Sequence, residues 1–102
     1  MMDVAVVGVG GWGKNLARTY FHIPECFLKY ICDLDQKRLD QLRFQLPGAI
    51  LTTHFEDLLK DPGLQAIAIA TTAATHYPLC KAALQAGKDV YVEKPFVLAP
   101  AL

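Results

Sequence analysis

The segment DVAVVGVGGWG, residues 3–13, decides the fold that this sequence predicts. Its β-branched run, VAVV (residues 4–7), is typical of a buried strand and continues directly into a glycine-rich turn, GVGGWG (residues 8–13). The residues that follow, 14–21, favour a helix. A strand, a glycine turn and a helix in this order form the arrangement in which a helix N-terminus binds the pyrophosphate of a dinucleotide. A structural glycine turn is the alternative.

Each glycine of this turn has a predicted physical role. Gly8 permits the tight turn after the strand, Gly10 lets the backbone approach the phosphates without a Cβ, and Gly13 lets the helix pack close to the strand. We expect Gly11 and Trp12, in the same turn, to contact the cofactor as well. Two roles are open for Trp12, which either flanks the nicotinamide side of the pyrophosphate or packs between helix and sheet.

An acidic residue at the predicted distance strengthens the dinucleotide interpretation. Asp33 lies twenty residues beyond Gly13, at the end of the strand-like segment FLKYIC (residues 27–32). A carboxylate at the tip of the second strand accepts hydrogen bonds from the adenosine ribose hydroxyls. A nearby second acid, Asp35, favours NAD over NADP, whose 2′-phosphate needs a cation, and Arg38 is near enough to keep NADP as a minority alternative.

The composition is that of one small globular domain over residues 1–102, with 53% apolar residues and no linker or repeat. Ten basic and ten acidic residues cancel, and no basic cluster occurs, so we expect neither nucleic acid nor an anionic membrane as a partner. No apolar run is long enough to span a bilayer.

The first residues and the cysteines indicate a cytoplasmic location. Met1-Met2-Asp3 leads directly into the first predicted strand, without a basic segment or a cleavage site typical of a secretory signal. Cys26, Cys32 and Cys80 are odd in number and widely spaced, which suits small buried hydrophobic residues in a reducing compartment rather than a disulfide frame, a metal site or a catalytic thiol.

Strands and helices alternate along the whole chain. Strands are predicted at 4–7, 27–32, 49–52, 66–70 and 89–92, and helices at 11–21, 36–46, 53–59 and 75–86. Right-handed crossovers then give an α/β, Rossmann-type, doubly wound parallel sheet with strand order 3-2-1-4-5. The loops after the strands meet at one edge of such a sheet, where ligands bind.

Local signals set several of these boundaries. Asp35 is expected to cap the second helix, Thr53 and Glu56 to form a capping box, and Gly87 to end the last helix in a left-handed conformation. The aromatic residues predicted in the core are Tyr20, Phe21, Phe44 and Phe55. His22 and His54 are expected at the surface or near helix ends.

Three segments together resemble a known family. They are the glycine turn with Asp33, the segment ATTAATHY (residues 70–77) and the segment AGKDVYVEKP (residues 86–95). The set resembles the N-terminal half of the glucose-fructose oxidoreductase/inositol dehydrogenase (Gfo/Idh/MocA) family, over essentially all 102 residues. The turn GWGKNL (residues 11–16) is similar to that of members that oxidise nucleotide-linked sugars, such as the UDP-N-acetylglucosaminuronate 3-dehydrogenases.

The resemblance implies an NAD-dependent dehydrogenase that moves a hydride between nicotinamide and a hydroxyl of a sugar, nucleotide sugar or cyclitol. It implies that Lys94 acts catalytically on the substrate hydroxyl, that Pro95 orients it and that Glu93 lies beside the nicotinamide ribose.

It further implies that Thr71, Thr72 and His76 line the cofactor, although His76 is equally well a helix-start residue. Thr71-Thr72 replaces the Thr-Pro or Asn-Pro often found there.

The family's second, substrate-binding domain is absent from these residues, so we expect a fragment of a longer two-domain enzyme that is inactive alone and homo-oligomeric at full length. The alternative function is a dinucleotide-sensing or scaffold module without hydride chemistry. Two further interpretations stay open: a methyltransferase, which the Glu-Lys-Pro sequence disfavours, and a Rossmann unit trimmed for study of its fold.

Overall fold

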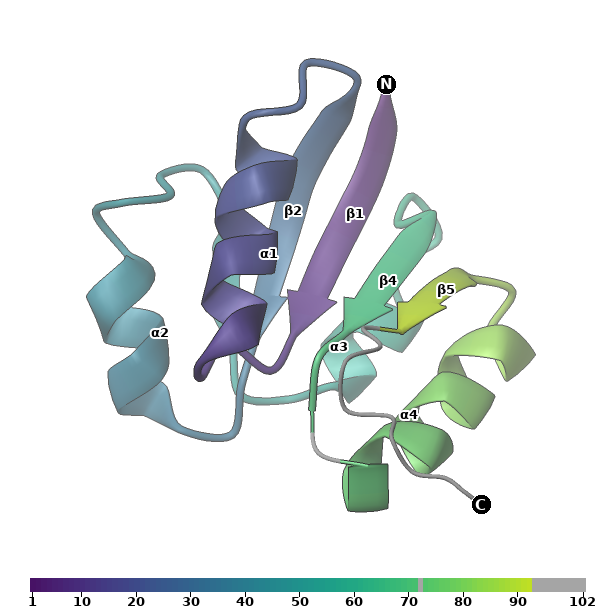
Figure 1. Cartoon of the computed structure of the whole chain (residues 1–102). Coiled ribbons are helices and arrows are strands. Elements are labelled where there is room, and N and C mark those ends of the chain that lie inside the picture. Colours follow the sequence, from purple (N-terminus) through teal and green to yellow (C-terminus); the bar gives the residue numbers. More distant parts are fainter. Residues whose placement is uncertain (72, 93–102) are drawn as a thin grey trace.

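A computed structural model of the chain describes residues 1–71 and 73–92; for residues 12 and 73–76 it describes the backbone alone. The elements, in chain order, are β1 (Met2–Val7), α1 (Trp12–Phe21), β2 (Cys26–Cys32), α2 (Gln36–Leu42), β3 (Ile50–Thr52), α3 (Glu56–Leu59), β4 (Ala66–Ile69), α4 (Ala73–Gln85) and β5 (Asp89–Val92). The described strands form one sheet in the order β3-β2-β1-β4-β5, and every pair is parallel. The predicted strand order is confirmed (Figure 1).

Helices cover both faces of the sheet, α1 and α2 on one side and α3 and α4 on the other (Figure 1). The alternation of side chains along β1 divides the core accordingly. Val4 and Val6 pack towards α1 and α2, whereas Ala5 and Val7 pack towards α3 and α4.

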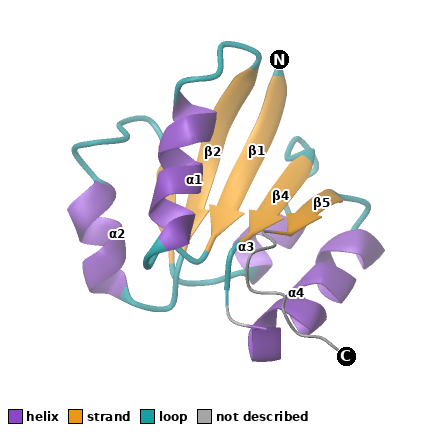
Figure 2. Ribbon diagram, in the orientation of Figure 1, coloured by secondary structure: helices purple, strands orange, loops and turns teal. Residues whose placement is uncertain are grey.

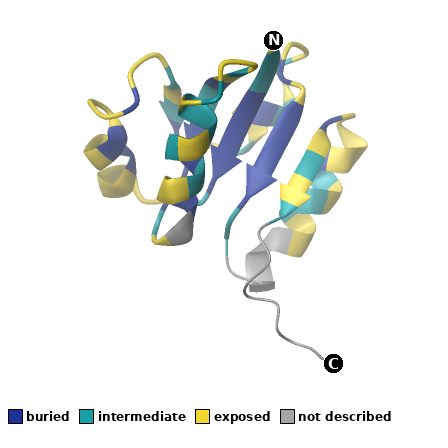
Figure 3. Cartoon of the chain, turned by 45° about the horizontal axis from the view of Figure 1, so that its top comes forward, coloured by how far each residue is buried: buried dark blue, intermediate teal, exposed yellow. Residues whose placement is uncertain are grey.

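The central strand β4 is buried along its whole length, as its apolar sequence AIAI predicts. Its alanines face α1 and its isoleucines face α4, and Figure 3 shows the buried central strands between helices whose outer surfaces are exposed. Complete burial of an isoleucine such as Ile67 contributes about 1.5–3 kcal/mol. Two-sided burial of β4 therefore fixes the middle of the sheet.

The second helix is shorter than the predicted helix 36–46. Asp35 caps it as expected, accepting a hydrogen bond from Lys37 N at 2.9 Å, but the helix ends at Leu42 and continues as turns. Pro47 disfavours a helical conformation in the residue before it, so the helix cannot extend through Leu46. Leu46 remains buried.

The prediction that Phe44 belongs to the core is wrong, because Phe44 is 89% exposed. In a helical turn, Phe44 lies two residues, or roughly 200°, from both Leu42 and Leu46, which face the core. The other three predicted core aromatics are partly buried against the two core clusters.

The predicted capping box of Thr53 and Glu56 is also wrong. The preceding residue, Thr52, is buried at the end of β3; its Oγ1 accepts a hydrogen bond from His54 N at 3.0 Å and donates to Asp57 Oδ2 at 2.7 Å. The helix begins at Glu56, without a side-chain cap. The strand-end threonine thus organises the turn one residue earlier than predicted.

The remaining boundaries agree with prediction to within two residues. The largest shifts are of two residues: β1 begins at Met2 rather than residue 4, and α4 begins at Ala73 rather than residue 75. Gly87 follows it with φ of +81°, which confirms the predicted left-handed end.

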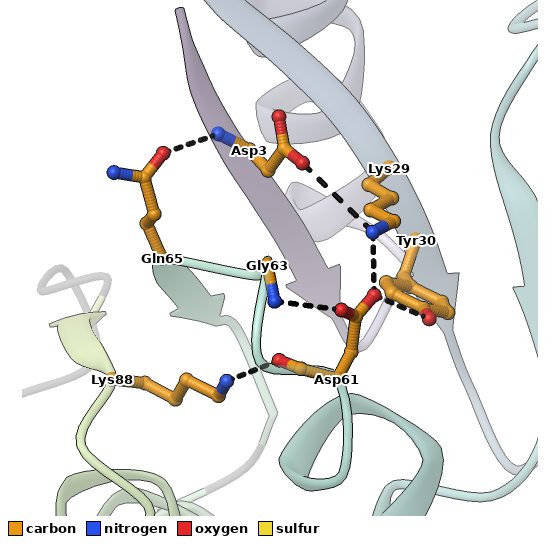
Figure 4. A network of polar contacts seen from close by, with 7 residues as sticks. All are labelled: Asp3, Lys29, Tyr30, Asp61, Gly63, Gln65 and Lys88. Atoms are coloured by element: carbon orange, nitrogen blue, oxygen red, sulfur yellow. Dashed lines mark hydrogen bonds and ion pairs between the residues drawn. The ribbon is translucent and has the colours of Figure 1, made fainter.

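A polar cluster joins the turn before β4 to β2 (Figure 4). Asp61 Oδ2 lies 2.6 Å from Lys29 Nζ and accepts a hydrogen bond from Tyr30 Oη at 2.8 Å, while Asp61 Oδ1 accepts one from Gly63 N. These bonds lower the pKa of Asp61 to about 2, with the Lys29 ammonium as the largest cause. The backbone carbonyl of Asp61 accepts a hydrogen bond from the buried ammonium of Lys88.

A bulge explains how two consecutive residues of β2 reach the same carboxylate. The pairing of β1 with β2 passes from Leu28 to Tyr30, so Lys29 is the extra residue. Consecutive strand residues otherwise point to opposite faces, and a bulge re-aims one of them.

Candidate functional site

The carboxyl ends of β1, β2 and β4 meet at one edge of the sheet (Figure 2), as parallel strands require. A cavity of about 1070 Å³ opens there. Among the residues that line it are Gly8, Gly10, Asp33, Arg38, Thr53 and Thr71. Its volume reaches the upper end of the range for small-molecule sites, which is roughly 300–1,000 Å³.

The glycine turn lies at the floor of this cavity. Gly8 has φ of +89°, which an L side chain rarely adopts, and its N–H donates to Cys32 O at 2.8 Å. A Cβ on Gly13 would lie 1.5 Å from Gly8 O. The first turn of α1 therefore packs directly on the backbone that leaves β1, which confirms the close packing predicted for Gly13.

No side chain in the described part of the chain caps the N-terminus of α1. Gly11 is its N-cap, with φ of +59°, and no acidic residue lies in its first turn. The first N–H groups of a helix and its positive dipole end attract anions. This end of α1 can therefore bind a phosphate group.

Asp33 is buried and tied to the glycine turn. Its Oδ2 accepts a hydrogen bond from Val9 N at 2.8 Å, and its Oδ1 accepts one from Asp35 N at 2.8 Å. Sequence reasoning assigned Asp33 only to a ribose; the structure adds that its carboxylate joins β1's turn to β2's end. Each carboxylate oxygen has about two acceptor positions, so each retains one for a hydroxyl group.

Arg38 lies on the same side of the cavity as Asp33. Its Nη1 is 3.7 Å from Asp33 Oδ2, and its Nε is 3.7 Å from Asp35 Oδ2. Sequence reasoning considered Arg38 only as a partner for NADP and did not place it against the glycine turn. The position of Arg38 on the first turn of α2, shortly after Asp33, was the available signal.

Thr71 lines the cavity from the end of β4. Its Oγ1 is buried and has no hydrogen-bond partner within the described residues. A buried hydroxyl without a partner is uncommon in proteins and indicates a missing ligand atom or water. Thr71 thus lines the cavity, and its contact with a cofactor stays a prediction.

Several predicted site residues lie outside the described part of the chain. These are Thr72, Glu93, Lys94 and Pro95, together with the side chains of Trp12 and His76. Conversely, the sequence prediction did not include Thr53 and Phe55, which are among the other residues that line the cavity. They follow β3, whose end reaches the same edge of the sheet.

Two of the three cysteine thiols, those of Cys32 and Cys80, are poor nucleophiles. Burial raises the pKa of Cys32 to about 12 and also raises the pKa of Cys80, so both thiols stay protonated. All three cysteines are free. Within residues 1–71 and 73–92 no group of three or more potential metal ligands gathers, and no helix there is long and apolar enough to cross a membrane.

Comparison with known proteins agrees with this geometry. The family described as "Oxidoreductase family, NAD-binding Rossmann fold" (Gfo/Idh/MocA) matches residues 2–101. One relative is the scyllo-inositol 2-dehydrogenase (NADP(+)) IolW of Bacillus subtilis, 30% identical over 92% of this chain and 26% of the relative.

Two solved structures share the fold closely. GenD2 from gentamicin A biosynthesis, solved in complex with NAD, superposes with a TM-score of 0.86 at 36% identity, over 96% of this chain and 28% of GenD2. The scyllo-inositol dehydrogenase of Lactobacillus casei, solved with NAD(H) and scyllo-inositol, gives a TM-score of 0.84 at 26% identity, over 93% and 28%. The chain thus spans little more than a quarter of the length of these three proteins. From residue 2 to residue 101, the chain belongs to the Gfo/Idh/MocA oxidoreductase family and forms its NAD-binding Rossmann domain.

Proposed function

We propose that this chain holds NAD in the cavity at the carboxyl edge of its sheet and serves an enzyme that moves a hydride between nicotinamide and a hydroxyl-bearing carbon of a sugar, nucleotide sugar or cyclitol. One observation carries the proposal: the Asp33 carboxylate, the glycine turn and the free N-terminus of α1 surround a single cavity. An anion site next to a carboxylate with spare acceptor positions matches a pyrophosphate joined to a ribose.

Different described residues bind different parts of the adenosine half of the cofactor. The N–H groups at the start of α1 bind the pyrophosphate, and Gly11, whose Cβ position has no described atom within 4 Å, leaves room for it. Gly10 lines the same cavity, but the guanidinium of Arg38 covers it in this structure. Asp33 accepts hydrogen bonds from the ribose hydroxyls with its remaining acceptor positions. Thr71, whose hydroxyl has no partner within the described residues, donates to an oxygen of the cofactor.

We assign the residues outside the described ranges by the family resemblance. When bound, NAD supplies the hydride acceptor. Lys94 polarises the substrate hydroxyl and takes up its proton, while Glu93 lies beside the nicotinamide ribose and Pro95 directs the lysine. The end of β5 at Val92 supports this assignment, because residues that follow a parallel strand reach the ligand edge. Trp12, Thr72 and His76 complete the predicted cofactor contacts.

The substrate class follows the relatives. One is named as a scyllo-inositol dehydrogenase and another is solved with scyllo-inositol bound, so a polyhydroxylated ring is the favoured substrate. The narrower assignment to UDP-N-acetylglucosaminuronate remains a prediction. The cavity residues described above do not form a binding surface for the substrate, and we place that surface in a second domain.

The organisation of the whole enzyme is part of the proposal. The chain spans about a quarter of the length of its relatives, which supports its being the cofactor domain of a two-domain protein. That the whole protein is a homo-oligomer stays a prediction. Three free cysteines support a reducing, cytoplasmic location.

Calorimetric titration of the 102-residue chain with NAD tests the binding step. We expect saturable heat for the unsubstituted chain, and a roughly 10- to 100-fold weaker affinity for Asp33→Ala, because hydrogen bonds to a carboxylate are lost. Asp40→Ala is the matched control, since Asp40 is an exposed carboxylate of α2 that pairs with Arg43 and does not line the cavity, and this variant is expected to bind NAD normally. Absence of heat with NAD and NADP in a folded chain would refute the proposal.

The chemical step needs a separate experiment on a protein that contains both domains. Lys94→Ala is expected to retain NAD binding while losing inositol- or sugar-dependent reduction of NAD. Unchanged turnover would remove Lys94 from the mechanism without affecting the cofactor site.

A further inference from the structure

The turn between β3 and α3 forms one side of the cavity. Thr53 and Phe55, both half-buried, line the cavity from this turn, and Asp33 lines it from the end of the neighbouring strand β2. Between the two turn residues, His54 is exposed and does not line the cavity. The path of the backbone from residue 52 to residue 57 therefore decides which side chains face the cavity beside Asp33.

One hydroxyl group fixes this path. Thr52 Oγ1 accepts a hydrogen bond from His54 N at 3.0 Å and donates one to Asp57 Oδ2 at 2.7 Å. The first bond closes the turn at its start, and the second ties it to the first turn of α3. Thr53 and Phe55 each lie between two residues of this bonded set, so both are held in place by it.

Thr52 is itself firmly anchored in the sheet. It is buried at the end of β3, where it pairs with Cys32 of β2, and its carbonyl oxygen accepts a hydrogen bond from Asp33 N at 3.2 Å. It does not line the cavity. Thr52 therefore acts on the cavity only through its neighbours, with its carbonyl on Asp33 and with its hydroxyl on the turn.

The hydroxyl holds the shape of the turn rather than satisfying buried groups. Both of its partners, His54 and Asp57, belong to exposed residues, so water can replace the hydroxyl at each of them. Removing the hydroxyl therefore frees the turn and leaves no buried polar group unsatisfied. When a site has its binding conformation for only a fraction of the time, the apparent affinity falls by that fraction.

We propose that Thr52 is a positioning residue for the dinucleotide: its hydroxyl holds Thr53 and Phe55 in the conformation that the adenosine half of the ligand requires, although Thr52 itself does not touch the ligand. The inference rests on the proposed dinucleotide site. It adds a residue outside the cavity that governs affinity through the turn between β3 and α3.

Calorimetric titrations with NAD and with ADP, which carries the adenosine and both phosphates but no nicotinamide, test the inference. Thr52→Val keeps the shape of the side chain without its hydroxyl, and we expect it to weaken both ligands by about 10-fold, the shift that one hydrogen bond to a charged group supports. Thr52→Ser keeps the hydroxyl and is expected to bind both within about threefold of the unsubstituted chain.

Tyr30→Phe is the matched control. It also removes one hydroxyl that donates to a carboxylate, that of Asp61 at 2.8 Å, and Tyr30 does not line the cavity. This variant is expected to change neither affinity, so it separates a general loss of stability from a local change at the cavity.

Asp57→Ala tests the same hydrogen bond from its other end. It is expected to weaken NAD as well, and combining it with Thr52→Val should add no further loss, because both variants remove one shared bond. Asp57 is exposed, so Asp57→Ala replaces Thr52→Val if circular dichroism shows that the valine variant is unfolded.

The possible failures are distinguishable. If the unsubstituted chain binds neither NAD nor ADP, the proposed function itself fails. The proposed function stands and the role of Thr52 is refuted if Thr52→Val binds as the unsubstituted chain does, if Tyr30→Phe loses the same factor, or if NAD is weakened and ADP is not. Failure of Thr52→Ser to restore binding, or independent losses in the double variant, would refute it too.

Discussion

Replacing Asp33 by alanine is expected to destabilise the fold itself, even without any ligand. The carboxylate is buried and accepts two backbone N–H groups, those of Val9 and Asp35, each at 2.8 Å. An N–H group left without an acceptor costs about 1–3 kcal/mol, so the two together cost about 2–6 kcal/mol. Because the site borders an open cavity, water can enter and accept hydrogen bonds from these N–H groups. This favours the lower half of the range, about 2–4 kcal/mol.

Urea denaturation followed by circular dichroism measures this loss as a change in the free energy of unfolding. Asp33→Asn keeps one oxygen and is expected to lose about half as much. The control, Asp35→Ala, removes an exposed helix cap and is expected to cost about 1 kcal/mol. An Asp33→Ala variant that is no less stable than Asp35→Ala would show that the carboxylate does not hold the turn, and the reasoning would be refuted.

Three further predictions concern other parts of the chain. Gly13→Ala is expected to lower the free energy of unfolding by at least about 3 kcal/mol or to prevent folding, because its Cβ would overlap the carbonyl of Gly8. The Cβ of Gly10→Ala meets only a movable side chain, so this variant is expected to stay folded. Equal stabilities of the two variants in urea would contradict this prediction. The pKa of Asp61 is about 2 against an ordinary 3.8, so its ionised carboxylate contributes stability that is present above pH 4 and is lost as the pH falls towards 2. In Asp61→Asn, melting temperatures measured across that pH range should no longer show this loss. Phe44→Ser is expected to change the unfolding free energy by less than about 0.5 kcal/mol, and a loss above 1 kcal/mol would show that the exposed ring is packed.

Sequence patterns predicted the structure best where it depends on the properties of neighbouring residues in the chain. The AIAI run predicted a strand buried on both faces, and Gly87 predicted a helix end, because hydrophobic periodicity and backbone freedom belong to the residues themselves. The capping box at Thr53 failed because Thr52, one residue earlier, offers the same hydroxyl chemistry at the strand end. Two adjacent threonines are indistinguishable until the strand's end is known.

The alternation of strands and helices, with a glycine turn after the first strand and an acid after the second, was enough by itself to determine a parallel Rossmann sheet and the edge at which it binds ligands. Only the tertiary structure decided that Asp33 also holds Val9, that Arg38 covers Gly10, and that a bulge brings Lys29 to a carboxylate beside β2. The first set depends on periodicity and handedness, which a chain carries in its order of residues. The second depends on register, rotamers and contacts between segments about 24 to 32 residues apart, which exist only once the layers have packed.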